Sequence, residues 1–117
     1  MLELKTYDVV LVDFGNDVIG SEQAGLRPAI IVQNNLGNHY SETTIVIPCT
    51  SRYRNLSQST HTLIKKGKQK GLTTDSVALA ECIRQISKQR IKAHLGKITD
   101  VKEKNDIKKC VFSSFGD

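Results

Sequence analysis

The sequence predicts a mainly β fold with a C-terminal helix (α+β), in a single domain that spans residues 1–117. Short runs rich in Val, Ile and Thr alternate with turns rich in Gly, Asn and Lys, which is typical of strands. Only the last stretch, after Asp100, carries apolar residues at helical spacing over several turns. Five or six short strands followed by one terminal helix indicate a small, strongly bent antiparallel barrel.

Composition and charge narrow the class of protein. The chain is 38% hydrophobic and 25% charged, with a formal net charge of +5 and a pI near 9.2. This balance favours an anionic partner such as nucleic acid. No run approaches the roughly 18 apolar residues that span a bilayer, and the N-terminus lacks the pattern of a signal peptide. We therefore expect a cytoplasmic protein that has no association with membranes.

The three cysteines indicate neither a disulfide framework nor a metal site. Cys49, Cys82 and Cys110 are far apart and odd in number, and they form no CxxC pair and no zinc spacing with a histidine. Each lies in an apolar context, as expected for a small buried side chain. We expect no metal and no other cofactor.

The first half of the chain predicts three strands. Residues 7–14 are short and rich in β-branched residues, which indicates a strand buried on both faces for much of its length. A loop follows up to Pro28, which is expected to be the first residue of the second strand because proline cannot donate to a ladder. Residues 34–38 are a turn cluster, and 43–49 form a third strand that pairs with the second. Pro48 suggests an edge position or a bulge.

The second half predicts shorter elements and one long helix. One or two helical turns are expected at 52–58, followed by a strand at 60–64 and a basic hairpin or loop at 65–71. A strand at 76–81 is expected to continue through 83–86 across a bend. A helical turn at 87–90 and a strand at 94–98 follow. Asp100 is the expected N-cap of the helix, with Glu103 completing a capping box. Its buried face is expected to hold Ile107, Cys110, Val111, Phe112 and Phe115.

The loop Gly20–Pro28 is the strongest candidate for a functional segment, because polar, Gly-punctuated loops between rigid strands often carry function. Arg27, at the base of a strand, presents a planar fork that matches phosphate oxygens. Thr50 ends the third strand, where a hydroxyl and backbone N–H groups could hold a phosphate. We expect these two loops to form one anion site. The alternatives are an ion pair of Arg27 with Glu22 or Asp13, and simple N-capping by Thr50.

Other residues are weaker candidates. Glu22 and Gln23 could transfer protons or contact a base edge, or could only satisfy their own loop. Aromatic residues make up 5% of the chain, so stacking on bases would depend on Phe14, Tyr40 or Tyr53.

Several motifs in a fixed order resemble the MazF/PemK family of toxin endoribonucleases. The resemblance covers nearly the whole chain, and the Gly-Ser-Glu-Gln…Arg-Pro block is its most specific part. The matching segments are Val-Asp-Phe at 12–14, Gly-Ser-Glu-Gln-Ala-Gly-x-Arg-Pro at 20–28, the strand ending in Gln33-Asn34, Pro-Cys-Thr-Ser at 48–51 and Asp-Ser-Val-Ala-Leu-Ala-Glu-Cys-Ile-Arg at 75–84.

This resemblance implies a small SH3-like antiparallel barrel of the PemK/CcdB type and the toxin role in a type II toxin–antitoxin system. Family members are homodimers that cut single-stranded RNA, such as mRNA, at short sequences without metal. A MazE-like antitoxin blocks the site, and operator DNA is reached only through the antitoxin. The implied catalytic residues are Arg27, Thr50 and Glu22. The implied RNA-binding residues are Phe14, Gly20, Ser21, Gln23, Ser51, Arg52, Glu81, Cys82 and Arg84.

The implied reaction is attack of an RNA 2′-OH on its own 3′-phosphate, giving a 2′,3′-cyclic phosphate and a 5′-OH end. Arg27 would stabilise the charge that develops on the phosphorane, and Thr50 would orient the phosphate. Glu22 is the candidate base, and the donor of the leaving-group proton stays open.

Two departures and two alternatives complete the prediction. Tyr7-Asp8 stands where the family usually has Gly-Asp, and Cys82 replaces a glutamine found in many relatives, which could alter the recognised RNA sequence. A CcdB-like toxin that binds gyrase would share the barrel without needing Arg27 or Thr50. An inactive binding module or autorepressor component is the other alternative.

Overall fold

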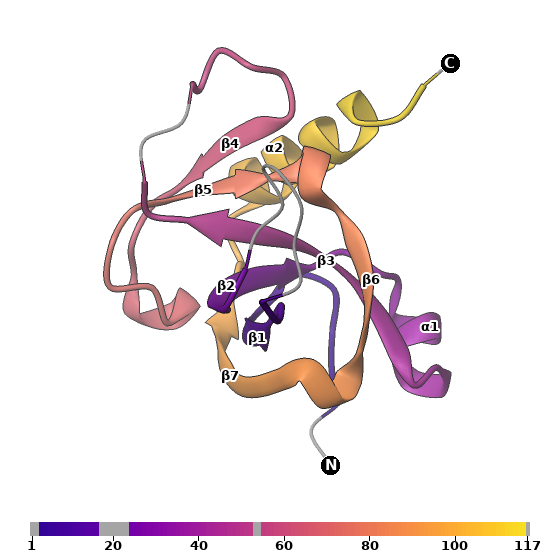
Figure 1. Ribbon diagram of the computed structural model, residues 1–117. Helices are drawn as coiled ribbons and strands as arrows, with labels where there is room; N and C mark the ends of the chain where they lie inside the picture. The colour runs from indigo at the N-terminus through magenta and orange to yellow at the C-terminus, as the bar shows by residue number, and fades with distance from the viewer. Residues whose placement is uncertain (1–2, 17–23, 53–54, 117) are drawn as a thin grey trace.

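The computed structural model describes residues 3–16, 24–52 and 55–116 as a bent antiparallel sheet with a helix at its C-terminal end (Figure 1). The strand order is β4-β5-β3-β2-β1-β7, and β6 pairs with β3 outside this path. The strands are β1 (Asp8–Asp13), β2 (Leu26–Ile31), β3 (Thr43–Thr50), β4 (His61–Ile64), β5 (Ser76–Leu79), β6 (Arg84–Ser87) and β7 (Ile91–Lys97). The helices are α1 (Asn35–Tyr40) and α2 (Val101–Ser113), with 3-10 turns η1 (Lys68–Lys70), η2 (Ala80–Cys82) and η3 (Lys88–Arg90).

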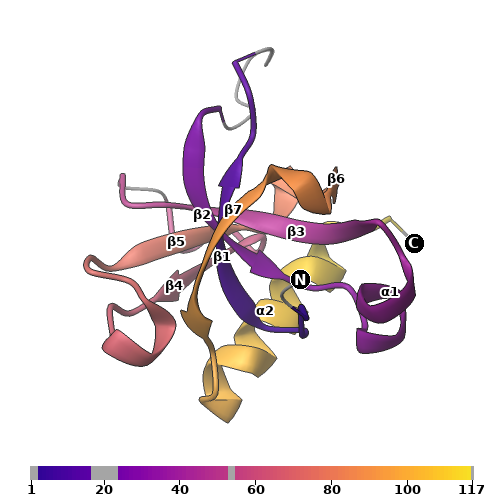
Figure 2. The ribbon, with the colours of Figure 1, turned by 90° about the horizontal axis from the view of Figure 1, so that it is seen from below.

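The predicted mainly β fold with a C-terminal helix is confirmed. The strands curl around a common interior, as the view from below shows (Figure 2), and the principal extents are 38 × 34 × 33 Å. Within the described ranges no ladder joins β4 to β7, so the barrel stays open between these two edge strands.

Strand β3 organises the sheet because it has partners on both edges. One edge pairs with β2, and the other pairs with β6 through Thr43–Val46 and with β5 through Cys49 and Thr50. Pro48 lies between the β6 ladder and the β5 ladder, where its missing N–H removes no bond to either strand. The strand as a whole is central, but at Pro48 this side of β3 has no paired neighbour, so the proline lies at a local edge where the strand changes partner.

Strand β2 starts earlier than predicted. Its register with β1 places Arg27 opposite Val12 and Leu26 opposite Asp13, so pairing with β1 carries the strand two residues before Pro28. The ladder to β3 begins only at Ala29, which leaves Pro28 outside it. The predicted antiparallel pairing of the second and third strands is confirmed.

The turn cluster predicted at 34–38 is instead the short helix α1. Asn34 caps it by accepting a hydrogen bond from the Gly37 N–H at 2.8 Å. Asn38, buried on the inner side, donates to the Gln33 carbonyl at 3.0 Å and accepts from the Thr44 hydroxyl at 2.8 Å. These partners, from the residues just before and just after the segment, stabilise a helix whose sequence alone favours a turn.

The helical turns predicted at 52–58 are absent from the residues of that segment that the structure describes. Residues 55–58 form non-helical turns, in which the Asn55 side chain accepts from the Ser57 N–H at 3.0 Å. An asparagine that bonds backbone two residues on favours a turn over a helix. The predicted strand at 60–64 and the predicted helical turn at 87–90 are present as β4 and η3.

Helix α2 begins where predicted, but fewer of its side chains are buried than the sequence predicted. The Asp100 carboxylate accepts from the Glu103 N–H at 3.0 Å, which confirms the N-cap. Ile107 and Cys110 are buried, whereas Phe112 is 69% exposed and Phe115 is 56% exposed. At 100° per residue Phe112 turns away from the sheet, and Phe115 follows the end of the helix. The prediction that these two rings are buried is wrong.

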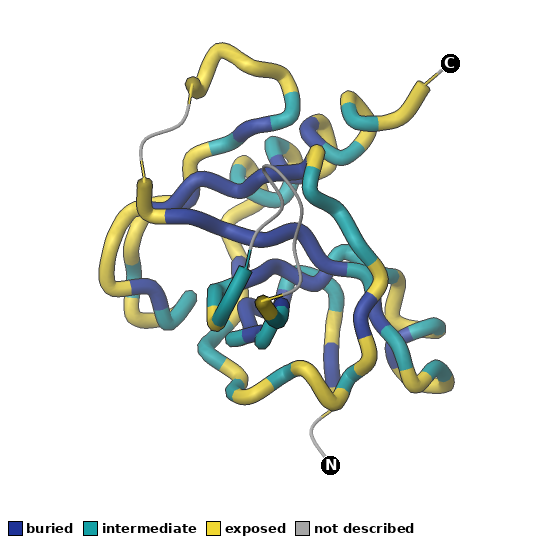
Figure 3. The backbone as a smooth tube through the Cα atoms, viewed as in Figure 1, coloured by how far each residue is buried: buried dark blue, intermediate teal, exposed yellow. Residues whose placement is uncertain are grey.

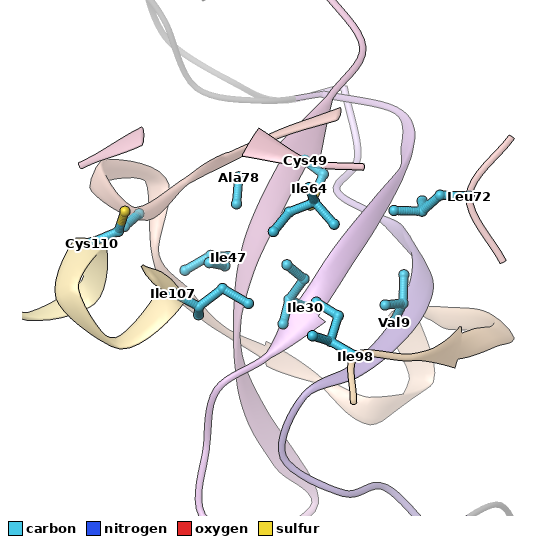
Figure 4. Close-up of a cluster of buried hydrophobic side chains, with 11 residues drawn as sticks. Val9, Ile30, Ile47, Cys49, Ile64, Leu72, Ala78, Ile98, Ile107 and Cys110 are labelled. Carbon is cyan, nitrogen blue, oxygen red and sulfur yellow. The ribbon is translucent and has the colours of Figure 1, made fainter. Parts of the chain in front are cut away.

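Both faces of the central strands are buried, as predicted for the first strand (Figure 3). One core cluster includes Val9, Ile30, Ile47 and Ile107 and lies between the sheet and α2 (Figure 4). Alternating residues of the same strands supply a second cluster, whose members are Leu4, Val10, Val12, Phe14, Ala29, Ile31, Val46 and Ile86.

Two glycines bring η1 and β7 into backbone contact. Gly71 ends the η1 turn with φ +70°, and a Cβ there would lie 2.2 Å from the Leu95 carbonyl oxygen. A Cβ at Gly96 would lie 2.2 Å from the Gln69 carbonyl oxygen. Only glycine fits at either position, so this contact fixes the turn on the sheet.

We predict that Gly96→Ala lowers the free energy of unfolding by about 3 kcal/mol, because the new methyl meets backbone rather than a flexible side chain. The midpoint of thermal unfolding should fall by roughly 10 °C or more. Gly116→Ala is the matched control, since a Cβ at Gly116 meets no atom within 4 Å. Equal unfolding midpoints for the two variants would contradict the close contact.

Candidate active site

Arg27 is held at the start of β2 by its own loop. Its Nε donates to the Ala24 carbonyl at 2.8 Å, and the side chain is half-buried. No described carboxylate forms an ion pair with Arg27, and the Asp13 carboxylate accepts from the Gly15 N–H at 2.8 Å instead. The structure therefore does not favour the Asp13 alternative, while Glu22 lies outside the described residues.

Arg27 and Ser51 line one pocket, of about 250 Å³. The start of β2 and the end of β3 thus lie on the same hollow, because these two strands are antiparallel neighbours. A third segment, Gly71–Thr74, forms the opposite part of the wall. The complete lining is Leu26, Arg27, Pro28, Cys49, Ser51, Gly71, Leu72, Thr73, Thr74 and Ser76.

Thr50 lies beside this pocket but is 3% exposed. It pairs with Val77 of β5, and its hydroxyl oxygen accepts from the Arg52 N–H at 3.2 Å. No helix starts here among the described residues, so this bond closes a local turn, as a threonine hydroxyl does with backbone two residues on, and is not a helix N-cap. The hydroxyl still has its own hydrogen to donate, so this bond does not exhaust its chemistry.

Phe14 does not offer a free stacking surface in this structure, contrary to the prediction. The residue is 3% exposed and belongs to the second core cluster. The Arg84 guanidinium carbon lies 5.6 Å from the centre of the ring, within the range of a cation–π contact. Any contact with a base at this position would involve Arg84.

Glu81 and Cys82 lie in η2, and neither lines the Arg27 pocket. The Glu81 carboxylate lies 2.7 Å from Nε2 of the buried His61, whose Nδ1 is 2.9 Å from the Asn55 carbonyl oxygen. Glu81 therefore anchors the 55–60 segment to the sheet. Cys82 is half-buried, and Arg84 begins β6.

Two groups of residues that the sequence predicted to bind RNA remain. One lies near the pocket, and the other lies outside the residues that the structure describes. Arg52 is exposed next to Ser51 at the end of β3. Gly20, Ser21, Glu22 and Gln23 fall within 17–23, outside the described residues, so their roles stay predictions.

The sequence alone did not identify Thr73, Thr74 and Ser76 as part of this pocket. They precede or begin β5, which is paired with the end of β3 at Cys49 and Thr50. Only the pairing register between β3 and β5 could have identified these three residues, because it places the start of β5 next to the end of β3.

Comparisons with known proteins show the family to which the chain belongs. The family model described as PemK-like, MazF-like toxin of type II toxin–antitoxin system matches residues 5–113. The chain belongs to this toxin family. A curated relative, Endoribonuclease MazF of Staphylococcus saprophyticus, is 46% identical over 97 residues, which cover 83% of this chain and 79% of the relative.

Solved structures share the fold of this PemK/MazF-family chain at low identity. MazF from Deinococcus radiodurans has a TM-score of 0.79 at 18% identity, covering 97% of this chain and 96% of its own. A mycobacterial endoribonuclease in complex with its cognate antitoxin has a TM-score of 0.76 at 21% identity, covering 95% and 93%. The matched family and relatives are MazF-type toxins, so the gyrase-binding alternative is not supported.

The described part of this family member has neither a membrane-spanning helix nor a cluster of metal-binding side chains. No helix there is long and apolar enough to span a membrane. No group of three or more His, Cys, Asp or Glu side chains there is placed to hold a metal ion.

Burial controls the chemistry of the cysteines, which form no disulfide. Cys49 is fully buried beside the Arg27 pocket, and loss of hydration raises the pKa of its thiol to about 12. Burial also raises the pKa of the Cys110 thiol, and the Asp106 carboxylate adds to the effect. Cys49 is therefore a thiol, and not a nucleophilic thiolate, at neutral pH.

We predict that iodoacetamide at pH 8 labels the half-buried Cys82 of the native protein much faster than Cys49 or Cys110. Peptide mass spectrometry after short exposures would measure the three rates. Labelling in denaturant, which removes the burial, should bring the rates together. Fast labelling of Cys49 in the native protein would contradict the burial of this strand.

Proposed function

We propose that this chain is the toxin of a type II toxin–antitoxin system and cuts single-stranded RNA, including mRNA, at short specific sequences without a metal ion. The likeness to the Staphylococcus saprophyticus endoribonuclease carries this proposal. The placement of Arg27 on a pocket with Ser51 supports it, because a cleavage site needs a fixed cation at an accessible hollow.

Arg27 has the geometry expected of a group that binds a phosphate. Nε is occupied by the Ala24 carbonyl, while the two terminal nitrogens make no hydrogen bond with any described residue. A guanidinium held through Nε presents the remaining fork in a fixed direction. The positive charge is thus set in place before the substrate binds, so it stabilises the phosphorane without reorganisation.

In the proposed reaction the 2′-oxygen attacks the adjacent phosphorus, and the bond from phosphorus to the 5′-oxygen breaks. Glu22 takes the 2′-OH proton, and Thr50 orients the phosphate through its hydroxyl hydrogen. The products are a 2′,3′-cyclic phosphate and a 5′-OH end. The 5′-oxygen takes its proton from solvent water, because a guanidinium is not deprotonated in proteins and Arg27 therefore does not act as the donor.

The other predicted residues are proposed to bind the RNA on either side of the cut. Ser51 and Arg52 lie at the exposed end of β3, next to Arg27. Arg84, covering Phe14, offers a charged and planar surface at the start of β6. The further members of the proposed contact set are Gly20, Ser21, Gln23, Glu81 and Cys82.

The proposed partners follow from the family. Two structural relatives are complexes with an antitoxin, one mycobacterial and one of MazE and MazF from Deinococcus radiodurans. We propose that this chain acts in the cytoplasm as a homodimer, is inhibited by a MazE-like antitoxin and meets operator DNA only through that antitoxin.

We predict that the wild-type protein cleaves a long RNA in EDTA and that Arg27→Ala lowers the rate by at least about 10²- to 10³-fold, the usual cost of removing one preorganised charge-stabilising group. Gel mapping of the cut sites and rates would measure this. Lys108→Ala, on the exposed side of α2, is the control and should cleave like wild type. Equal cleavage by wild type and Arg27→Ala would overturn the assignment of Arg27.

A second prediction tests the nucleophile. Replacing only the ribose on the 5′ side of the cut bond by deoxyribose should abolish cleavage, since the attacking oxygen is gone, while binding is retained. A deoxyribose on the 3′ side of the bond is the matched control and should be cut. Cleavage of the first substrate would show that water, and not the 2′-OH, attacks.

A further inference from the structure

The basic turn between β4 and β5 continues the Arg27 pocket. A neighbouring hollow of about 630 Å³ is lined by Lys66, Gly67, Lys68, Gly71, Leu72 and Thr73. Gly71, Leu72 and Thr73 also line the Arg27 pocket. The two hollows therefore share one wall, and Thr73 is the exposed residue at the junction.

This turn is anchored on three sides, so its shape does not depend on a ligand. Leu72 is buried in the main core cluster. Gly71 is in backbone contact with β7. Lys70 forms a largely buried ion pair with Glu103 of α2 at 2.8 Å and also donates to the Lys65 carbonyl at 2.8 Å.

The lysines of the turn differ in whether their charge is paired. The Lys70 ammonium forms an ion pair with the Glu103 carboxylate, and the two side chains are only 17% and 14% exposed. Lys66 and Lys68 are exposed, and among the described residues no carboxylate forms an ion pair with either ammonium group. Asp75 is the nearby acidic group, and it accepts from the Lys66 backbone N–H at 2.8 Å. Two cations therefore remain beside the hollow that adjoins Arg27.

We propose that Lys66 and Lys68, with Thr73 between them and Arg27, form a track for the phosphate backbone of single-stranded RNA that flanks the cut. Lysine acts here as a point charge on a phosphate, which adds affinity and carries no sequence information. The track thus contributes to substrate binding, while Arg27 acts on the bond that breaks. This inference rests on the proposed function, because the track extends the same pocket.

The test uses Lys66→Gln/Lys68→Gln in the full chain and a labelled single-stranded RNA with one mapped cut sequence and flanks on both sides. At low salt KM should rise roughly tenfold with kcat and the cut position unchanged. The slope of log(1/KM) against log salt should become shallower by about 1.4, which is about 0.7 for each lost phosphate contact. With an RNA trimmed to the cut sequence, the variant and wild type should have the same KM.

The control is Lys108→Gln/Lys109→Gln, which removes the same charge from the exposed side of α2. It should leave KM and the salt slope at wild-type values. If both double variants change KM and the slope equally, the effect is one of net charge and the track is overturned. If Lys66→Gln/Lys68→Gln behaves like wild type, the track is overturned while the proposed function stands.

Failure of the proposed function has a different signature. If the wild type cleaves no RNA, fluorescence anisotropy of the same labelled RNA measures the Kd and salt slope of all three proteins. A weaker Kd and a shallower slope confined to Lys66→Gln/Lys68→Gln support the track without cleavage. Equal values for the three proteins overturn it.

Discussion

The double pairing of β3 is the constraint on which the candidate site depends. Because β2 occupies one edge of β3 and β5 occupies the end of the other, the last residues of β3 lie between Arg27 and the turn before β5. Pro48 lies where β3 has left β6 and not yet joined β5. The hollow lies at this end of the sheet and is lined by residues of β2, β3 and the start of β5.

The sequence was most informative where burial is two-sided. Val9 belongs to one core cluster and Val10 to the other, so both faces of their strand are buried. A run of consecutive β-branched residues of this kind predicts a central strand. It was least informative where side-chain contacts with residues outside a segment decide its structure. The composition of Asn34–Asn38 favours a turn, yet the hydrogen bonds of Asn38 with Gln33 and Thr44 stabilise a helix there. Periodicity likewise could not show that the sheet stops short of Phe112.

The candidate site, like the fold, was predictable only in the part that local sequence determines. Arg27 and Thr50 stand out because each polar side chain borders an apolar run, and the structure places Arg27 on a hollow that Cys49 and Ser51, the neighbours of Thr50, also line. Thr73 carries no such local signal, since its position depends on the register between β3 and β5. The burial of Phe14 was not predictable, because a lone aromatic residue at a strand end gives no indication of whether a neighbour such as Arg84 covers it.

The ion pair between Lys70 and Glu103 has a consequence for the order of events during synthesis. A chain emerging from the ribosome makes the whole sheet before it makes α2. Until Glu103 and Ile107 have emerged, the β4–β5 turn lacks its partner and the main core cluster lacks one wall. A partly made chain already contains every residue that lines the pocket, but its β4–β5 turn gains the third anchor, the ion pair of Lys70 with Glu103, only when α2 has been made.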